Sequence, residues 1–117
     1  MDPLRRQPTD ARAEKLLEVA VELGELDREF PIQLLQTLLY VASHKDCHKQ
    51  ALEEDLSFST ASGSRNTDWL SKEHRLGKKG LGLITKEKDP TNRRRLQLSL
   101  TVEGQCLIDT LKGILYD

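Results

Sequence analysis

With 117 residues, the chain is long enough for one domain and too short for two ordinary ones. Only 37% of its residues are hydrophobic, and no apolar run approaches the ~20 residues that span a bilayer, so we expect no membrane segment. Two cysteines in unlike contexts, and an N-terminus without the apolar stretch of a secretory signal, predict a reduced, cytoplasmic setting.

The net charge of −1 conceals an uneven distribution. Residues 61–95 carry 10 Lys/Arg and 4 Asp/Glu, whereas residues 1–60 carry 7 and 12, and residues 96–117 carry 1 and 3. Binding to phosphate depends on the local field rather than on the total charge. On charge alone, a nucleic-acid surface and a solvated charged face are equally plausible.

The first half of the chain predicts two long helices. Thr9 or Asp10 is a suitable N-cap, and apolar residues then recur at helical spacing over residues 10–28. Pro31 suits the first turn of a second helix that ends near Ser43. That second helix is apolar on more than one side, so we expect it to be the most buried.

Residues 47–73 have the pattern of a helix-turn-helix. A short helix over residues 47–55 is followed by a turn and then by a helix over residues 60–73 with Ser59 as its N-cap. A later start, with Ser62 as the cap, is the alternative because Gly63 lowers helix propensity by roughly 1 kcal/mol. A purely structural helix hairpin remains equally plausible on this pattern alone.

The second helix of this pair is expected to turn Trp69 and Leu70 inward. Ser62, Ser64, Arg65, Thr67 and Asp68 would then face solvent or a ligand. Short polar side chains and arginine are the groups that contact base edges and phosphates in the major groove. The candidate DNA contacts on this helix are Ser62, Ser64, Arg65, Asn66 and Thr67.

A β-hairpin follows. Residues 83–87 predict one strand, Asp89-Pro90-Thr91-Asn92 a turn, and residues 94–100 a second strand in which apolar and polar residues alternate. Thr101 then caps a last helix over residues 101–116. The predicted fold class is mainly α with a small β-hairpin, a winged helix-turn-helix in one domain that spans residues 1–117, with the helix-turn-helix and wing over residues 31–100.

The hairpin carries a basic tip. Arg93, Arg94 and Arg95 flank the turn, where they would reach phosphates or the minor groove, and Asp89 and Asn92 would give the turn its shape. We expect Asp89 to accept hydrogen bonds from the turn backbone or from one arginine. Lys72, Lys78 and Lys79, in a glycine-rich loop before the hairpin, are candidate phosphate contacts. The alternative role of the three arginines is protection of an edge strand.

These motifs resemble those of the MarR family of winged-helix regulators. The matching features are Gly80-Leu81 before the first strand, the Asp-x-x-Asn-Arg-Arg turn from Asp89, and Leu-Thr-x-x-Gly from Leu100 to Gly104. The stretch from Ala61 to Leu70 is similar to the family's recognition helix. The resemblance implies sequence-specific binding of double-stranded DNA by a homodimer, and the loop over residues 72–82 is longer than in typical members.

Other classes of function have weaker support. His44, Cys47 and His48 lie close together but lack the paired spacing of zinc ligands, so we expect no metal, and no cofactor or enzyme site is apparent. Cys47 as a redox sensor is a minor alternative. The leading hypothesis is a transcriptional repressor. The rivals are a component of a replication, partition or architectural complex, and a protein-interaction module.

Overall fold

The computed structural model describes residues 6–72, 77 and 79–117. Its elements in chain order are α1 (Ala11–Leu26), α2 (Ile32–Ser43), β1 (Cys47–His48), α3 (Lys49–Leu56), α4 (Thr60–Leu70), β2 (Ile84–Lys88), β3 (Leu96–Leu100) and α5 (Val102–Tyr116). The predicted class, helices with a small antiparallel sheet, is confirmed.

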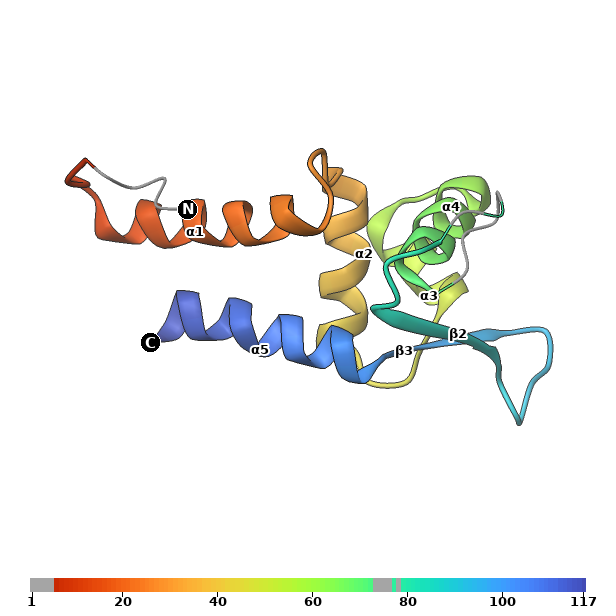
Figure 1. Cartoon of the computed structure of the whole chain (residues 1–117). Coiled ribbons are helices and arrows are strands. Elements are labelled where there is room, and N and C mark those ends of the chain that lie inside the picture. Colours follow the sequence, from red (N-terminus) through yellow and green to blue (C-terminus); the bar gives the residue numbers. More distant parts are fainter. Residues whose placement is uncertain (1–5, 73–76, 78) are drawn as a thin grey trace.

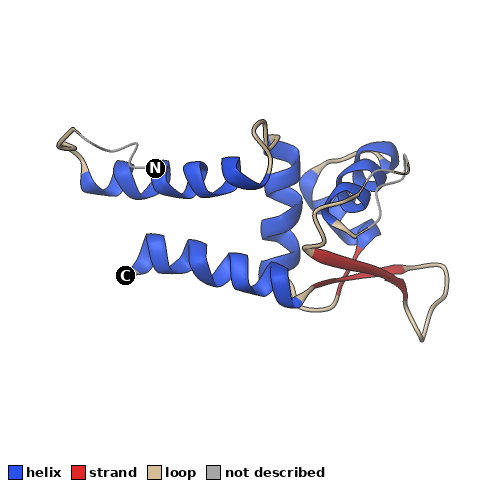
Figure 2. Ribbon diagram, in the orientation of Figure 1, coloured by secondary structure: helices blue, strands red, loops and turns tan. Residues whose placement is uncertain are grey.

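The molecule has two parts that meet at α2 (Figure 1). On one side, α1 and α5 run next to each other away from α2, and we call this pair the arm. On the other side, α3, α4 and the sheet pack against α2, and we call residues 32–100 the body (Figure 2). The arm makes the molecule elongated, with extents of 53 × 28 × 26 Å. No helix of the described residues is long and apolar enough to cross a membrane.

The first two helices begin where the sequence predicts. One carboxylate oxygen of Asp10 accepts hydrogen bonds from the backbone N–H groups of Arg12, at 3.1 Å, and Ala13, at 3.0 Å, which caps α1. Pro31 stands at the N-cap position of α2, where its missing N–H group costs nothing. The expectation that α2 is the central, most buried helix is correct, because it contacts α3, α4 and β3.

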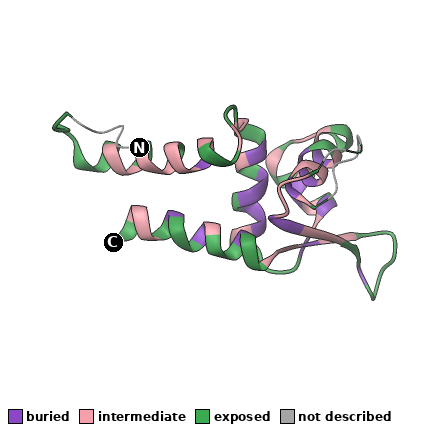
Figure 3. Ribbon diagram, viewed as in Figure 1, coloured by how far each residue is buried: buried purple, intermediate pink, exposed green. Residues whose placement is uncertain are grey.

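Most of the buried apolar side chains lie in the body (Figure 3). Its completely buried apolar side chains come from every body element except β1, namely Leu34 and Leu38 of α2, Leu52 of α3, Leu70 of α4, Ile84 of β2 and Leu98 of β3. Complete burial of one such side chain contributes about 1.5–3 kcal/mol. The body therefore holds α4 and the hairpin on one aliphatic core.

The sheet has three strands in the order β1-β3-β2, all antiparallel. The sequence predicts only the hairpin of β2 and β3 and assigns Cys47 to the start of a helix. Instead, Cys47 pairs with Leu98 and His48 with Gln97, and α3 starts only at Lys49. The chain enters this strand through Asp46, whose φ of 56° ends the preceding turn. A strand of two residues is too short to show alternation.

The Leu-Thr-x-x-Gly motif fixes the junction between the sheet and α5. The Thr101 hydroxyl accepts from the backbone N–H of Gly104, at 3.0 Å, and donates to the carbonyl of Gly82, at 2.7 Å. A Cβ on Gly104 would overlap the carbonyl of Leu83. The threonine therefore caps α5 and ties it to the segment before β2, and the glycine permits the close approach.

Candidate nucleic-acid interface

The helix-turn-helix consists of α3, a three-residue turn and α4. Ser57 closes α3 in the left-handed conformation, with φ 57°, and the Ser59 hydroxyl accepts from the Ser62 backbone N–H at 3.1 Å. The helix thus begins at Thr60 after the predicted cap, and the alternative start after Gly63 is wrong. Gly63 lies where α3 and α4 approach each other, because a Cβ there would overlap the side chain of Glu53.

One face of α4 is open to solvent. Ala61 and Arg65 are exposed, Ser62 and Ser64 are half-buried, and Lys72 is exposed just beyond the helix. The Arg65 guanidinium donates to the Ser62 hydroxyl at 3.4 Å. This face therefore presents one arginine and two hydroxyls on a rigid helix, as a major-groove reader requires.

Asn66 and Thr67 belong to the buried face, so the expectation that Thr67 faces solvent is wrong. Asn66 is 3% exposed and its amide donates to the side-chain oxygen of Gln33 on α2, at 3.2 Å. Thr67 is 0% exposed and its hydroxyl donates to the carbonyl of Gly63, at 2.7 Å. Positions 63, 66, 67 and 70 share one helical face, and Leu70 directs that face into the core. Both polar groups are satisfied within the protein, on the side of α4 that faces away from solvent.

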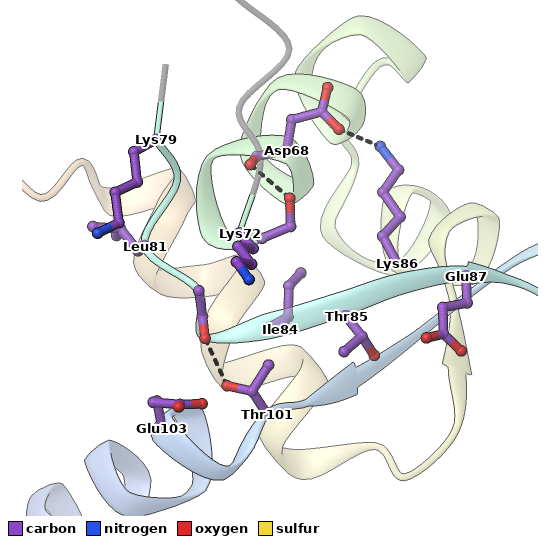
Figure 4. A pocket seen from close by; sticks show the side chains of 12 residues that line it. Asp68, Lys72, Lys79, Leu81, Ile84, Thr85, Lys86, Glu87, Thr101 and Glu103 are labelled. Carbon is purple, nitrogen blue, oxygen red and sulfur yellow. Dashed lines mark hydrogen bonds and ion pairs between the residues drawn. The ribbon is translucent and has the colours of Figure 1, made fainter. Parts of the chain in front are cut away.

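Asp68 also differs from its expected solvent-facing role. It is half-buried, and it accepts from the Nζ of Lys86 on β2, at 2.7 Å (Figure 4). The pair spans a hollow of about 800 Å³ between the end of α4 and β2, which Lys72 and Lys79 also line. Lys86, which the sequence did not single out, thus balances an acidic group beside the open face of α4.

The described part of the loop before β2 returns along the end of α4. The backbone N–H groups of Gly80 and Leu81 donate to the carbonyls of Lys72 and Trp69, at 3.0 and 2.9 Å. A Cβ on Gly80 would overlap the Ser71 carbonyl. Lys79 is exposed on this returning segment, whereas Lys78 lies outside the described residues.

The turn of the wing, residues 89–95, is held by the side chains of Asp89 and Asn92. One carboxylate oxygen of Asp89 accepts from both the backbone N–H and the hydroxyl of Thr91, each at 2.8 Å. The Asn92 side-chain oxygen accepts from the Arg94 N–H at 3.1 Å. Of the two partners considered for Asp89, the structure shows the turn backbone. The Thr91 N–H, the His48 ring and the Thr91 hydroxyl, in that order, hold the pKa of Asp89 well below its usual range.

Arg93, Arg94 and Arg95 are all exposed on this turn. Arg95 additionally lines a small hollow beside α3 with His48 and Glu54. The turn that carries the three arginines lies at the end of the body opposite the arm (Figure 1).

His44, Cys47 and His48 make separate contacts. The ring of His44 stacks on Tyr40 with centroids 4.0 Å apart, and Cys47 is buried in the sheet, where burial raises the pKa of its thiol. His48 reaches the wing, with its Nε2 2.6 Å from a carboxylate oxygen of Asp89. No group of three metal-binding side chains occurs among the described residues.

A helix-turn-helix with an open second helix, followed by a β-hairpin with a basic tip, defines a winged-helix protein. The chain has the particular winged-helix fold of MarR-type transcriptional regulators, which confirms the resemblance at the level of the fold. No protein-family model and no curated protein sequence matches the chain.

Three solved structures illustrate this similarity. The DNA complex of MepR from S. aureus has a TM-score of 0.70 and 19% identity, over 87% of this chain and 77% of that one. A mutant MarR from E. coli complexed with operator DNA has a TM-score of 0.65 and 16% identity, over 91% and 69%. The transcriptional repressor CouR bound to a 23-mer DNA duplex has a TM-score of 0.60 and 19% identity, over 88% and 68%.

Proposed function

We propose that this protein is a transcriptional regulator that binds specific double-stranded DNA, with α4 in the major groove and the wing in the adjacent minor groove. The observation that carries the proposal is the joint exposure of Arg65 on α4 and of Arg93 and Arg94 on the wing, all mounted on one body. Arginine suits both positions, because it pairs with guanine edges and is attracted by the negative potential of a narrow minor groove.

The proposed contacts fall into three groups. Arg65, Ser62 and Ser64 read or anchor in the major groove. Lys72 and Lys79 contact phosphates, and the wing arginines, including Arg95, serve the minor groove or its phosphates. DNA-bound MepR, MarR and CouR of similar fold support duplex DNA as the partner. The description of CouR as a repressor supports repression as the mode of action.

We also propose that the working form is a homodimer joined through the arm. Leu16 and Leu17 on α1 and Val102 and Tyr116 on α5 are exposed, although each is apolar enough to favour burial. Two copies would then place two recognition helices on the two halves of a near-palindromic site.

Selection of bound sites from a random pool of duplexes tests this function. We expect one enriched near-palindromic motif, and we expect Arg65→Ala to bind it about tenfold more weakly, with less discrimination at one base pair. Arg28→Ala is the matched control, because Arg28 is an exposed arginine in the turn between α1 and α2, outside both the proposed DNA contacts and the arm. Broad affinity without a motif would favour an architectural role, and the absence of salt-dependent binding would favour a protein-interaction module.

A further inference from the structure

The wing is attached to the helix-turn-helix by a side-chain contact that its DNA-binding role does not itself require. The two carboxylate oxygens of Asp89 make different contacts. Oδ1 accepts from Thr91 and shapes the turn, whereas Oδ2 lies 2.6 Å from the Nε2 of His48. We call the second contact the His48–Asp89 bridge.

The bridge joins two segments that are 41 residues apart in the chain. His48 is the second residue of β1 and stands at the N-cap position of α3, so it belongs to the start of the helix-turn-helix. Asp89 directly follows β2 at the base of the turn that carries the arginines. A displacement of the wing relative to α3 must therefore break or lengthen this contact.

The bridge is partly shielded from water. The side chain of His48 is 26% exposed and that of Asp89 is 11% exposed. A charge-assisted hydrogen bond in such a place is stronger than a neutral one and is screened less than a pair on the open surface. The bridge therefore holds the wing more firmly when the imidazole is protonated than when it is neutral.

The ionic surroundings of His48 are mixed. Arg95 of the wing and Glu54 of α3 line the same small hollow. Gln97, the partner of His48 in the strand register, donates to Asp46 and pairs in turn with Glu87 of β2. The charged groups are thus Asp89, which contacts the ring, Glu54 and Arg95, which line its hollow, and Asp46 and Glu87, which are partners of Gln97. The one in direct contact is a carboxylate that hydrogen bonds from Thr91 and His48 keep ionised, with a lowered pKa.

We propose that His48 is a positioning residue for the wing, and that its protonation tightens DNA binding as pH falls. The proposal rests on the DNA-binding role of the wing proposed above. Histidine is the side chain whose charge ordinarily changes near neutral pH, and a protonated imidazole makes the stronger hydrogen bond to a carboxylate. Because the pKa of Asp89 is held well below its usual range, Asp89 stays ionised near neutral pH and no opposing change occurs within the bridge.

The first experiment needs no DNA. In a proton NMR titration of the full chain, the ring protons of His48 and the backbone amide of Thr91 should shift with one common midpoint. The Thr91 shift should disappear in His48→Gln, which keeps a side-chain donor but no longer titrates. A Thr91 amide that does not change with pH, or that titrates equally in His48→Gln, would overturn the bridge as a pH-responsive element.

The second experiment measures the affinity for the selected duplex at pH 6 and pH 8 and at constant ionic strength. We expect the parent to bind roughly two- to fivefold more tightly at pH 6, the range of a partly exposed charge pair. His48→Gln should bind like the parent at pH 8 but lose the pH dependence, and His48→Ala should bind more weakly at both pH values. Thermal unfolding checks that both variants are folded.

The exposed His44 provides a matched control. His44→Gln removes an imidazole that stacks on Tyr40 and, among the described residues, makes no contact with the wing. This variant should keep the pH dependence of the parent, and loss of that dependence in His44→Gln, with His48→Gln unchanged, would overturn the inference. If the parent binds no duplex at all, the proposed function fails. The NMR titration still tests whether the His48–Asp89 bridge responds to pH.

Discussion

The arm and the body bury their apolar residues to different extents (Figure 3). The body closes a core in which six apolar side chains are completely buried. In the arm, Leu23, Ile108 and Leu111 are buried in the same hydrophobic cluster as the body core, but Leu16 is 63% exposed, Val102 78% and Tyr116 80%. Apart from Ile32 and Leu39 of α2, which are 69% and 45% exposed, the body encloses its large apolar side chains within one chain, whereas the arm presents the apolar surface expected of a subunit interface. The proposed DNA contacts and the proposed self-association surface thus lie on opposite sides of α2 (Figure 1).

The largest expected effect concerns the body. Leu38→Ala removes a completely buried side chain from α2 and should lower the free energy of unfolding by about 2–5 kcal/mol. Leu39→Ala, at the neighbouring and exposed position, should change it by less than about 1 kcal/mol. Urea denaturation of the pair checks this difference, and equal losses would contradict the assignment of the core.

The second effect concerns the arm. Leu16→Asp places a charge in the proposed dimer interface and should give monomers, which sedimentation would detect. Affinity for a two-half-site duplex should then fall about a hundredfold, because the second half-site is no longer bound by a linked subunit. The unfolding of the single chain should change little, since Leu16 is exposed. A variant that remains dimeric would show that the arm does not join the subunits.

The third comparison separates two neighbours on α4. Asn66→Ala removes the donor to Gln33 from the buried face and should cost about 1–2 kcal/mol of stability. Arg65→Ala should leave stability within about 0.5 kcal/mol of the parent and reduce DNA affinity instead. Urea denaturation and DNA titration of both variants check this difference. A loss of stability in Arg65→Ala together with a loss of affinity alone in Asn66→Ala would contradict the assigned faces of α4.

The smallest effect concerns the attachment of α3 to α2. The Tyr40 hydroxyl donates to an Asp55 carboxylate oxygen at 2.6 Å, and this hydrogen bond, together with burial and the charge of Asp55, raises the pKa of Tyr40 to about 12. Tyr40→Phe should cost about 1 kcal/mol at neutral pH.

The dependence of stability on alkaline pH provides a second measurement on the same residue. Because the folded pKa of Tyr40 exceeds its ordinary value of 10.0, its contribution to stability is complete below pH 10 and is lost as pH rises toward 12. Tyr40→Phe should lack this part of the alkaline loss. An identical alkaline profile in both proteins would contradict the role of the hydrogen bond.

Patterns of several residues predicted most of the fold. Helical spacing, the caps Asp10, Ser59 and Thr101, and the turn at Asp89 indicated the correct elements, because each rests on local chemistry that recurs along the chain. The strand Cys47–His48 was missed because two residues carry no period, and only its partner in β3 defines it.

The candidate site was less predictable for a similar reason. Asn66 and Thr67 have side chains suited to DNA, but the phase of α4 against Leu70 and α2 turns them inward, which depends on packing. The partners Gln33, Lys86 and His48 come from distant segments and carried no local signal for their contacts. The exposure of the wing arginines could be predicted from the turn sequence alone, and their proposed role is unchanged.

The central claim is that the wing arginines contact DNA, and the salt dependence of binding tests it most directly. Affinities of the parent and of Arg94→Ala for the selected duplex would be measured at several salt concentrations, with Arg28→Ala as the charge-matched control. Loss of one phosphate contact should weaken binding by Arg94→Ala and lower the slope of log affinity against log salt by about one unit. Equal affinity and an equal slope for Arg94→Ala and the parent would contradict the claim.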